Sequence, residues 1–77
     1  MNLSEAREIW SRLARLSDGA PVRVNGQDMT RQTFADASEP RYGHPDSATV
    51  KVGYGLGRYN TDISVDQIRH GFVTVEI

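Results

Sequence analysis

The dipeptide Asn25-Gly26 constrains the fold of this chain more than any other sequence feature. Asn followed by Gly favours a two-residue hairpin turn of type I′, because both turn positions need a positive φ angle. The cross-strand pairs that this turn sets are Val24–Gln27, Arg23–Asp28 and Val22–Met29. Apolar side chains then share one face and an opposite-charge pair lies on the other, so the sequence predicts an antiparallel hairpin here.

The segment 50–63 predicts a second hairpin, with Leu56-Gly57 as its turn. In this register the cross-strand pairs are Tyr54–Tyr59, Lys51–Asp62 and Val50–Ile63. An aromatic pair, an ion pair and an apolar pair arise together, which favours this register over a turn one residue earlier. Gly53 and Gly55 lie on the face opposite the tyrosines, where they leave a bare strip that another backbone or side chain can approach closely.

The segment 3–16 is predicted to form an amphipathic helix. One buried stripe at helical spacing contains Leu3, Ala6, Ile9, Trp10, Leu13 and Leu16. Asn2 has capping-box spacing to Glu5, with Ser4 as the alternative N-cap, and Gly19 is expected to supply a left-handed helix end. We expect Trp10 to be the central residue of the core.

A short helix is expected over 31–37, with Thr30 as its N-cap and Phe34 on its apolar side. The segment 38–47 that follows has two Pro, one Gly and no hydrophobic periodicity. It is predicted to be a loop, and a loop of this length in a small domain is often functional or mobile.

The end of the chain predicts a further helix and a strand. Ser64 and Gln67 repeat the capping-box spacing and indicate a helix over 65–70, and residues 72–77 alternate as in a strand. We therefore expect a single small domain over residues 1–77 with an α+β fold: an N-terminal amphipathic helix packed on an antiparallel sheet of about five strands, with two short helices. The sheet consists of the two hairpins and the C-terminal strand, and a helix in front of a small β-barrel is the alternative.

The composition argues against several classes of function. Nine basic and ten acidic residues give a net charge of -1, which argues against a non-specific nucleic-acid binder and a polybasic membrane binder. The chain has no Cys, and its apolar runs are too short to span a bilayer. We expect a cytoplasmic protein, which lies in the host cytoplasm if a phage encodes it.

No pattern of residues predicts catalysis, a metal site or a cofactor. His44 with Asp46, and Asp66 with His70, offer too few ligands in separate segments for a zinc site. Ser64, Asp66 and His70 have the composition of a catalytic triad, but triad residues normally converge from distant segments. The prediction is a protein that is not an enzyme and holds neither metal nor cofactor.

We predict a partner-binding surface in the loop 38–47 and the hairpin that follows it. Eight of the nine basic residues are Arg, and Arg and Tyr are enriched at binding hot spots. The candidate anchors are Arg41, Tyr42, Tyr54, Arg58 and Tyr59. The exposed face of the first helix is the alternative surface, with Arg7, Arg12 and Arg15.

These features together predict a non-enzymatic protein-binding module. A small chain without Cys is typical of phage or mobile-element accessory proteins, which often inhibit or modulate a larger host complex, as anti-CRISPR proteins do. The first alternative is a structural or assembly subunit of phage-particle type that self-associates. The second is a single-stranded nucleic-acid binder that stacks its Arg and Tyr side chains on bases.

Overall fold

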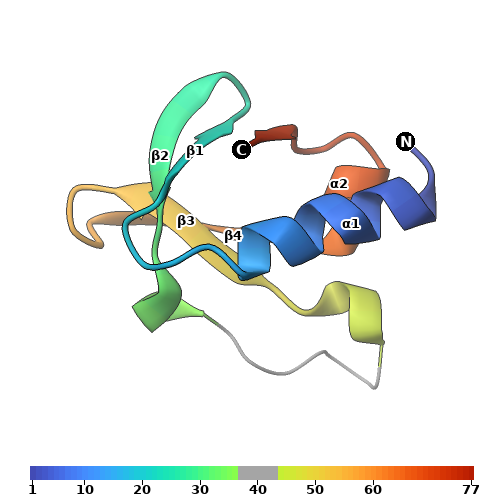
Figure 1. Cartoon of the computed structure of the whole chain (residues 1–77), viewed down its shortest axis with the longest axis horizontal. Helices are drawn as coiled ribbons and strands as arrows, with labels where there is room; N and C mark the ends of the chain where they lie inside the picture. Colours follow the sequence, from blue (N-terminus) through green and yellow to red (C-terminus); the bar gives the residue numbers. More distant parts are fainter. Residues whose placement is uncertain (37–43) are drawn as a thin grey trace.

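The computed structural model describes residues 1–36 and 44–77. Its elements in chain order are α1 (Leu3–Ala14), β1 (Pro21–Val24), β2 (Gln27–Arg31), the 3-10 turn η1 (Thr33–Ala35), the 3-10 turn η3 (Pro45–Ser47), β3 (Val50–Tyr54), β4 (Tyr59–Ile63), α2 (Val65–Arg69) and β5 (Val75–Glu76). Within this described part the strands form one antiparallel sheet in the order β4-β3-β2-β1-β5. The sheet curls into a half-barrel, and α1 lies beside α2 (Figure 1). The predicted α+β fold is confirmed.

Both predicted hairpins have the expected registers. Asn25 and Gly26 both have positive φ angles, and the pairs Val22–Met29, Arg23–Asp28 and Val24–Gln27 are present. In the second hairpin the pairs Tyr54–Tyr59, Lys51–Asp62 and Val50–Ile63 are present as well. The side chains of both charged pairs, Arg23–Asp28 and Lys51–Asp62, form ion pairs. Cross-strand complementarity was therefore sufficient to fix both registers.

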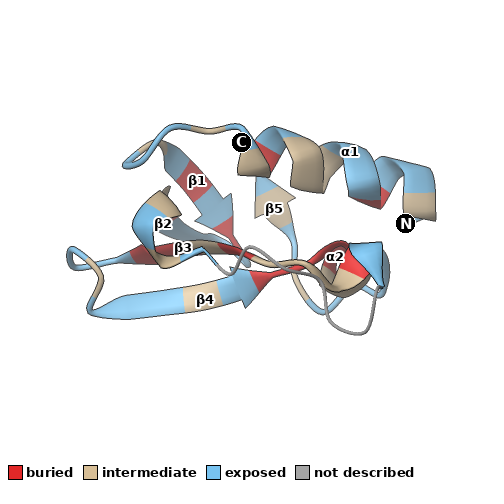
Figure 2. Ribbon diagram, turned by 90° about the horizontal axis from the view of Figure 1, so that it is seen from below, coloured by how far each residue is buried: buried red, intermediate tan, exposed pale blue. Residues whose placement is uncertain are grey.

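The hydrophobic core lies between α1, α2 and the concave face of the sheet. Its buried members are Ala6, Leu13, Val22, Val24, Met29, Val50, Val52, Ile63, Val65 and Ile68. Figure 2 shows that the buried segments of α1, β1 and α2 turn toward one another across this space. Trp10 was expected at the centre, but it is only partly buried and packs against the core from outside. Its indole Nε1 donates a hydrogen bond of 2.8 Å to the carbonyl of Ile63, which draws the ring toward the end of β4.

The first helix begins as predicted and ends two residues earlier. The side chain of Asn2 accepts a hydrogen bond of 2.8 Å from the N–H of Glu5, so Asn2 is the N-cap. The helix stops at Ala14, and Gly19 is not its cap. Gly19 has a φ angle of +85° and donates its N–H to the carbonyl of Arg31 at 2.8 Å, so it turns the chain into the sheet.

The helix predicted over 31–37 is wrong. Arg31 is the last residue of β2 and pairs with Val52, and only Thr33–Ala35 forms a single 3-10 turn. Phe34, expected on the packed side of that helix, is exposed. In its strand position Arg31 pairs with Val52 and buries its side chain against the carbonyls of Leu13 and Lys51 and the carboxylate of Asp36. Of the predicted loop 38–47, residues 38–43 lie outside the described part, and Pro45–Ser47 forms η3.

The closing strand is shorter than predicted. Residues 72–77 were expected to be a strand, but only Val75–Glu76 pairs, with Arg23 and Val24 of β1. The N–H groups of residues 72 and 73 both donate to the carbonyl of Gln67, at 3.0 and 3.3 Å. These bonds close the end of α2, so the chain re-enters the sheet only at Val75. The capping box between Ser64 and Gln67 at the start of α2 is present as predicted.

Candidate functional site

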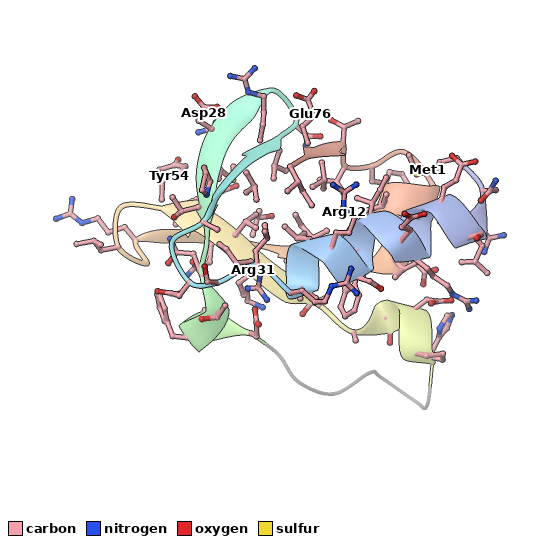
Figure 3. The ribbon with its side chains drawn as sticks, in the orientation of Figure 1. Met1, Arg12, Asp28, Arg31, Tyr54 and Glu76 are labelled. Atoms are coloured by element: carbon pink, nitrogen blue, oxygen red, sulfur yellow. The ribbon has the colours of Figure 1, made fainter. Side chains whose placement is uncertain are left out.

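A buried arginine organises one end of the sheet. The side chain of Arg31 is 1% exposed, and its Nε donates to the carbonyl of Leu13 at 3.1 Å. Its Nη1 donates to the carbonyl of Lys51 at 3.0 Å, and the guanidinium meets Asp36 with two hydrogen bonds of 2.8 and 2.7 Å. Figure 3 shows Arg31 at the C-terminal end of α1. One side chain thus ties the helix, β3 and the residue after η1 together.

The carboxylate of Asp36 is held ionised by this arrangement. Burial raises its pKa, but hydrogen bonds from Arg31 and from the N–H of Lys51, with the charges of both residues, outweigh burial and lower the pKa. The N–H of Lys51 donates to Asp36 Oδ1 at 2.8 Å. Because every acceptor around Arg31 is fixed by the backbone or by Asp36, the arginine holds the structure together and is not available to a substrate.

A groove opens beside this buried pair. It has a volume of about 540 Å³ and lies between the end of β2, η1 and the tip of the β3–β4 hairpin. Its polar lining includes Asp18, Thr30 and Gln32, and its apolar lining includes Phe34, Tyr54 and Leu56. We call it the hairpin groove. Phe34 is 68% exposed, Tyr54 is 44% exposed and Leu56 is 100% exposed. Large apolar side chains therefore gather around one concave surface without being covered.

The turn of this hairpin places a leucine in a conformation that leucine rarely adopts. Leu56 has a φ angle of +55°, and Gly57 follows with +93°. The left-handed region is disfavoured for residues with a Cβ, and Leu lacks the short polar side chain that makes Asn tolerable there. A Cβ on Gly57 would lie 3.1 Å from the ring of Phe34, so this ring, which belongs to η1, packs directly against the hairpin turn.

Two of the predicted anchors stack beside the groove. The rings of Tyr54 and Tyr59 are 4.8 Å apart between centroids and 17° from parallel, with both residues partly exposed. The side chain of Arg58 lies over Gly55, within 3.2 Å of where a Cβ on that glycine would be. Tyr54, Tyr59 and Arg58 are therefore brought together at the hairpin tip. Arg41 and Tyr42 lie outside the described residues.

The bare glycine strip is only partly available to a partner. A Cβ on Gly53 would collide with the backbone carbonyl of Tyr59 on the neighbouring strand, and Gly53 is buried. The close approach predicted for this glycine is therefore made within the hairpin. Gly55 and Gly57 remain at the tip, covered in part by Arg58 and Phe34.

Asp46 and Ser64, which were considered for metal binding and catalysis, have structural contacts. Asp46 accepts two hydrogen bonds from Arg7, at 3.0 and 2.9 Å, and these bonds lower its pKa more than burial raises it. His44 Nε2 lies 3.7 Å from Asp66 Oδ2, and the hydroxyl of Ser64 caps α2. Among residues 1–36 and 44–77, no three His, Asp or Glu side chains gather as a metal site would require. Arg7, from the alternative helix surface, is engaged by Asp46.

Sequence reasoning missed Phe34, Leu56, Gln32 and Asp18 as residues of this surface. Leu56 carried a usable signal, because it occupies a turn position that needs a positive φ angle. The backbone N–H of Gln32 donates to the carbonyl of Lys51, and Asp18 accepts from Thr33 next to Phe34, and no local sequence pattern reveals these contacts.

The comparisons with known proteins give no relative. No family model, curated protein or solved structure matches this chain. In the part of the chain that the structure describes, no helix has the length and apolar character needed to cross a membrane.

Proposed function

We propose that this chain is a non-enzymatic protein-binding module and that its partner docks at the hairpin groove. The observation that carries this proposal is Leu56, a fully exposed leucine held at a φ angle of +55°. A strained backbone that presents an uncovered apolar side chain lowers the stability of the free protein. Such a residue is best explained by a contact made only in a complex.

The surroundings of Leu56 support the same proposal. Phe34 packs its ring edge against Gly57 and leaves 68% of its surface exposed, and Tyr54 stacks on Tyr59 at the groove wall. Binding hot spots are enriched in rigid aromatic and Arg side chains around a concave centre. Arg58 at the hairpin tip supplies the charged rim. Within this proposal, inhibition of a larger host complex and a cytoplasmic location remain predictions from the sequence.

The test uses two matched aromatic truncations. Phe34 lines the groove, whereas Phe72 is 77% exposed and follows α2, away from the groove lining. The partner is first isolated on the immobilised wild-type protein and purified, and its affinity is then measured by calorimetry for each variant. Phe34→Ala is expected to weaken binding by about 2 kcal/mol, which is about thirtyfold, and Phe72→Ala to leave it unchanged.

Circular dichroism provides the control, because both phenylalanines are exposed and neither variant should unfold. If Phe34→Ala binds as tightly as wild type, the groove is the wrong surface. If Phe72→Ala alone loses binding, the partner docks at the α2–β5 connection instead.

Self-association is the second candidate, and one observation favours it. A shallower hollow of about 330 Å³ lies beside β1 and β5 and is lined by Met29, Arg23 and Ile77 among others. Ile77 is half exposed there, at a sheet edge made of a strand of two residues. Sedimentation equilibrium decides this point, because a monomer at micromolar concentration favours the binding module and a defined oligomer favours the assembly subunit.

Single-stranded nucleic-acid binding is the third candidate. Four of the eight Lys and Arg residues in the described part of the chain, Arg7, Arg23, Arg31 and Lys51, pair with an aspartate, which halves the number of cations outside ion pairs that could meet phosphates. Salt-dependent binding to an oligonucleotide would favour this candidate over the other two.

A further inference from the structure

One polar side chain in the wall of the hairpin groove has an unused hydrogen-bonding group. Gln32 lines the groove and is only 4% exposed. Its Nε2 donates to Thr30 Oγ1 at 3.1 Å, but its Oε1 has no hydrogen-bond partner among the described residues. A buried acceptor without a donor destabilises the free protein and is uncommon in native structures.

The hydrogen bond of Thr30 determines which end of the amide is left unpaired. The hydroxyl of Thr30 has one hydrogen, and Oγ1 lies 3.3 Å from the carbonyl of Gly53, which can only accept. With its hydrogen on the carbonyl of Gly53, Thr30 Oγ1 accepts from Gln32, so the NH₂ group of Gln32 faces Thr30. The unpaired atom is the amide oxygen, and only a donor can satisfy it.

The charges around the groove do not favour a charged occupant. Arg31 is neutralised by Asp36, and its bonds to the carbonyls of Leu13 and Lys51 occupy other donors. Asp18 accepts hydrogen bonds from the N–H and the hydroxyl of Thr33, at 2.9 and 3.1 Å. Arg58 at the hairpin tip is positively charged and Asp18 is negatively charged, so the two charges offset each other. The groove thus offers apolar walls and one neutral acceptor.

We infer that the groove takes an extended, uncharged peptide segment of the partner, which donates a backbone N–H to Gln32 Oε1 and places a large aliphatic side chain against Phe34, Tyr54 and Leu56. This inference rests on the proposed function. An extended segment has backbone N–H groups to donate, whereas a helix uses most of its own internally. Because the oxygen is covered in the free protein, the terminal amide of Gln32 has to turn about χ3, a torsion with a broad energy well, and give up its hydrogen bond to Thr30 to meet the donor.

Two small probes test the donor directly. N-acetyl-leucine N-methylamide has backbone N–H groups and a leucine side chain, and N-acetyl-N-methyl-leucine dimethylamide keeps the apolar groups without any N–H. Each is titrated into the ¹⁵N-labelled full chain, and the side-chain NH₂ signals of Gln32 and the backbone signals of residues 54–57 are followed by NMR. We expect millimolar binding of the first probe, as is typical of so small a ligand, and binding of the second that is weaker by about tenfold.

The variant Gln32→Met separates a binding role from a structural one. Met has nearly the same size without the unpaired oxygen, so the melting temperature is expected to stay level or rise. The preference for the first probe is expected to disappear. If Gln32 is merely structural, the melting temperature falls and the preference remains, which overturns the inference.

The other outcomes are equally decisive. Equal binding of the two probes would show that no N–H donates to Gln32 Oε1 and that the groove is merely apolar. If neither probe shifts any signal at its solubility limit, the groove does not take an uncharged peptide segment. Tighter binding of N-acetyl-lysine N-methylamide replaces the neutral segment with a basic one. None of these results removes the proposed function, which is tested separately, by the binding of Phe34→Ala to the purified partner.

Discussion

The two hairpins of this protein have turns of the same kind but place different residues at the position that needs a positive φ angle. Asn25 occupies it in the first turn with a φ angle of +51°, and Leu56 occupies it in the second with +55°. Asn tolerates this conformation, and its Oδ1 also accepts a hydrogen bond of 2.9 Å from the N–H of Thr74. The first turn is therefore tied to the segment that leads into β5.

The second turn has no equivalent support from its first central residue. The side chain of Leu56 is fully exposed, and the turn is held by Arg58 N–H on the carbonyl of Gly55 at 3.2 Å and by the ring of Phe34. The first turn is thus supported by the side chain of its own Asn, whereas the second has a fully exposed leucine on a backbone conformation that disfavours it. This difference separates the structural end of the sheet from the end that we propose to be the binding surface.

The largest effect is expected at Gly53, beneath the second turn. A Cβ there collides with the backbone carbonyl of Tyr59, and a backbone atom on a paired strand cannot move aside easily. Gly53→Ala should lower the free energy of unfolding by about 3 kcal/mol, as measured by chemical denaturation.

Gly26→Ala is the matched change in the first hairpin. No atom lies within 4 Å of its added Cβ, so only the φ angle of +79° opposes it, at about 1–2 kcal/mol. Equal losses for the two variants would show that the close approach at Gly53 does not matter.

The next largest effect is expected when Asn25, the first residue of the first turn, is exchanged. Asn25→Leu removes the two side-chain bonds to Thr74 and introduces the strain that Leu56 already carries, so a loss of about 2–3 kcal/mol is expected. Asn25→Asp keeps the Oδ1 acceptor and the tolerance for positive φ, and should remain close to wild type. Thermal melts of the three proteins check this, and an unchanged melting temperature for Asn25→Leu would contradict the role of the first turn.

Acid should weaken the ion pair between Arg31 and Asp36 beside the groove, and the variant Asp36→Asn should reveal this. The pKa of Asp36 is lowered in the folded protein, so its stabilising effect is complete above the ordinary aspartate pKa of about 3.9 and is lost as the pH falls through the folded value. At neutral pH we expect Asp36→Asn to be less stable than wild type by about 2 kcal/mol. Denaturation curves between about pH 7 and pH 2 should converge in acid. A constant difference across that range would contradict the ionised pair.

The sequence predicted those parts of the fold that depend on neighbouring or cross-strand pairs. The turns at Asn25-Gly26 and Leu56-Gly57, the ion pairs Arg23–Asp28 and Lys51–Asp62, and the capping box of α2 all follow from local spacing. The predicted helix over 31–37 failed because Thr30 and Phe34 gave a local helical signal, while the bonds of Arg31 to Leu13, Lys51 and Asp36 decided the outcome.

The candidate site was predictable only in part for the same reason. Tyr54, Arg58 and Tyr59 were found because they flank a turn visible in the sequence, and they lie together at the hairpin tip. Phe34 and Gln32 join them only because β2 continues to Arg31 and turns sharply into η1. That turn depends on a side chain buried between distant segments, and spacing along the chain carries no trace of it.

Leu56→Asn tests the central claim most directly, because it predicts opposite changes in stability and in binding. Asn suits the left-handed position, so the free energy of unfolding should rise by about 1 kcal/mol, while affinity for the purified partner should fall by about thirtyfold. Both quantities are measured on one preparation, by denaturation and by calorimetry. A variant that is more stable and binds as tightly as wild type would contradict the account, and so would one that is less stable.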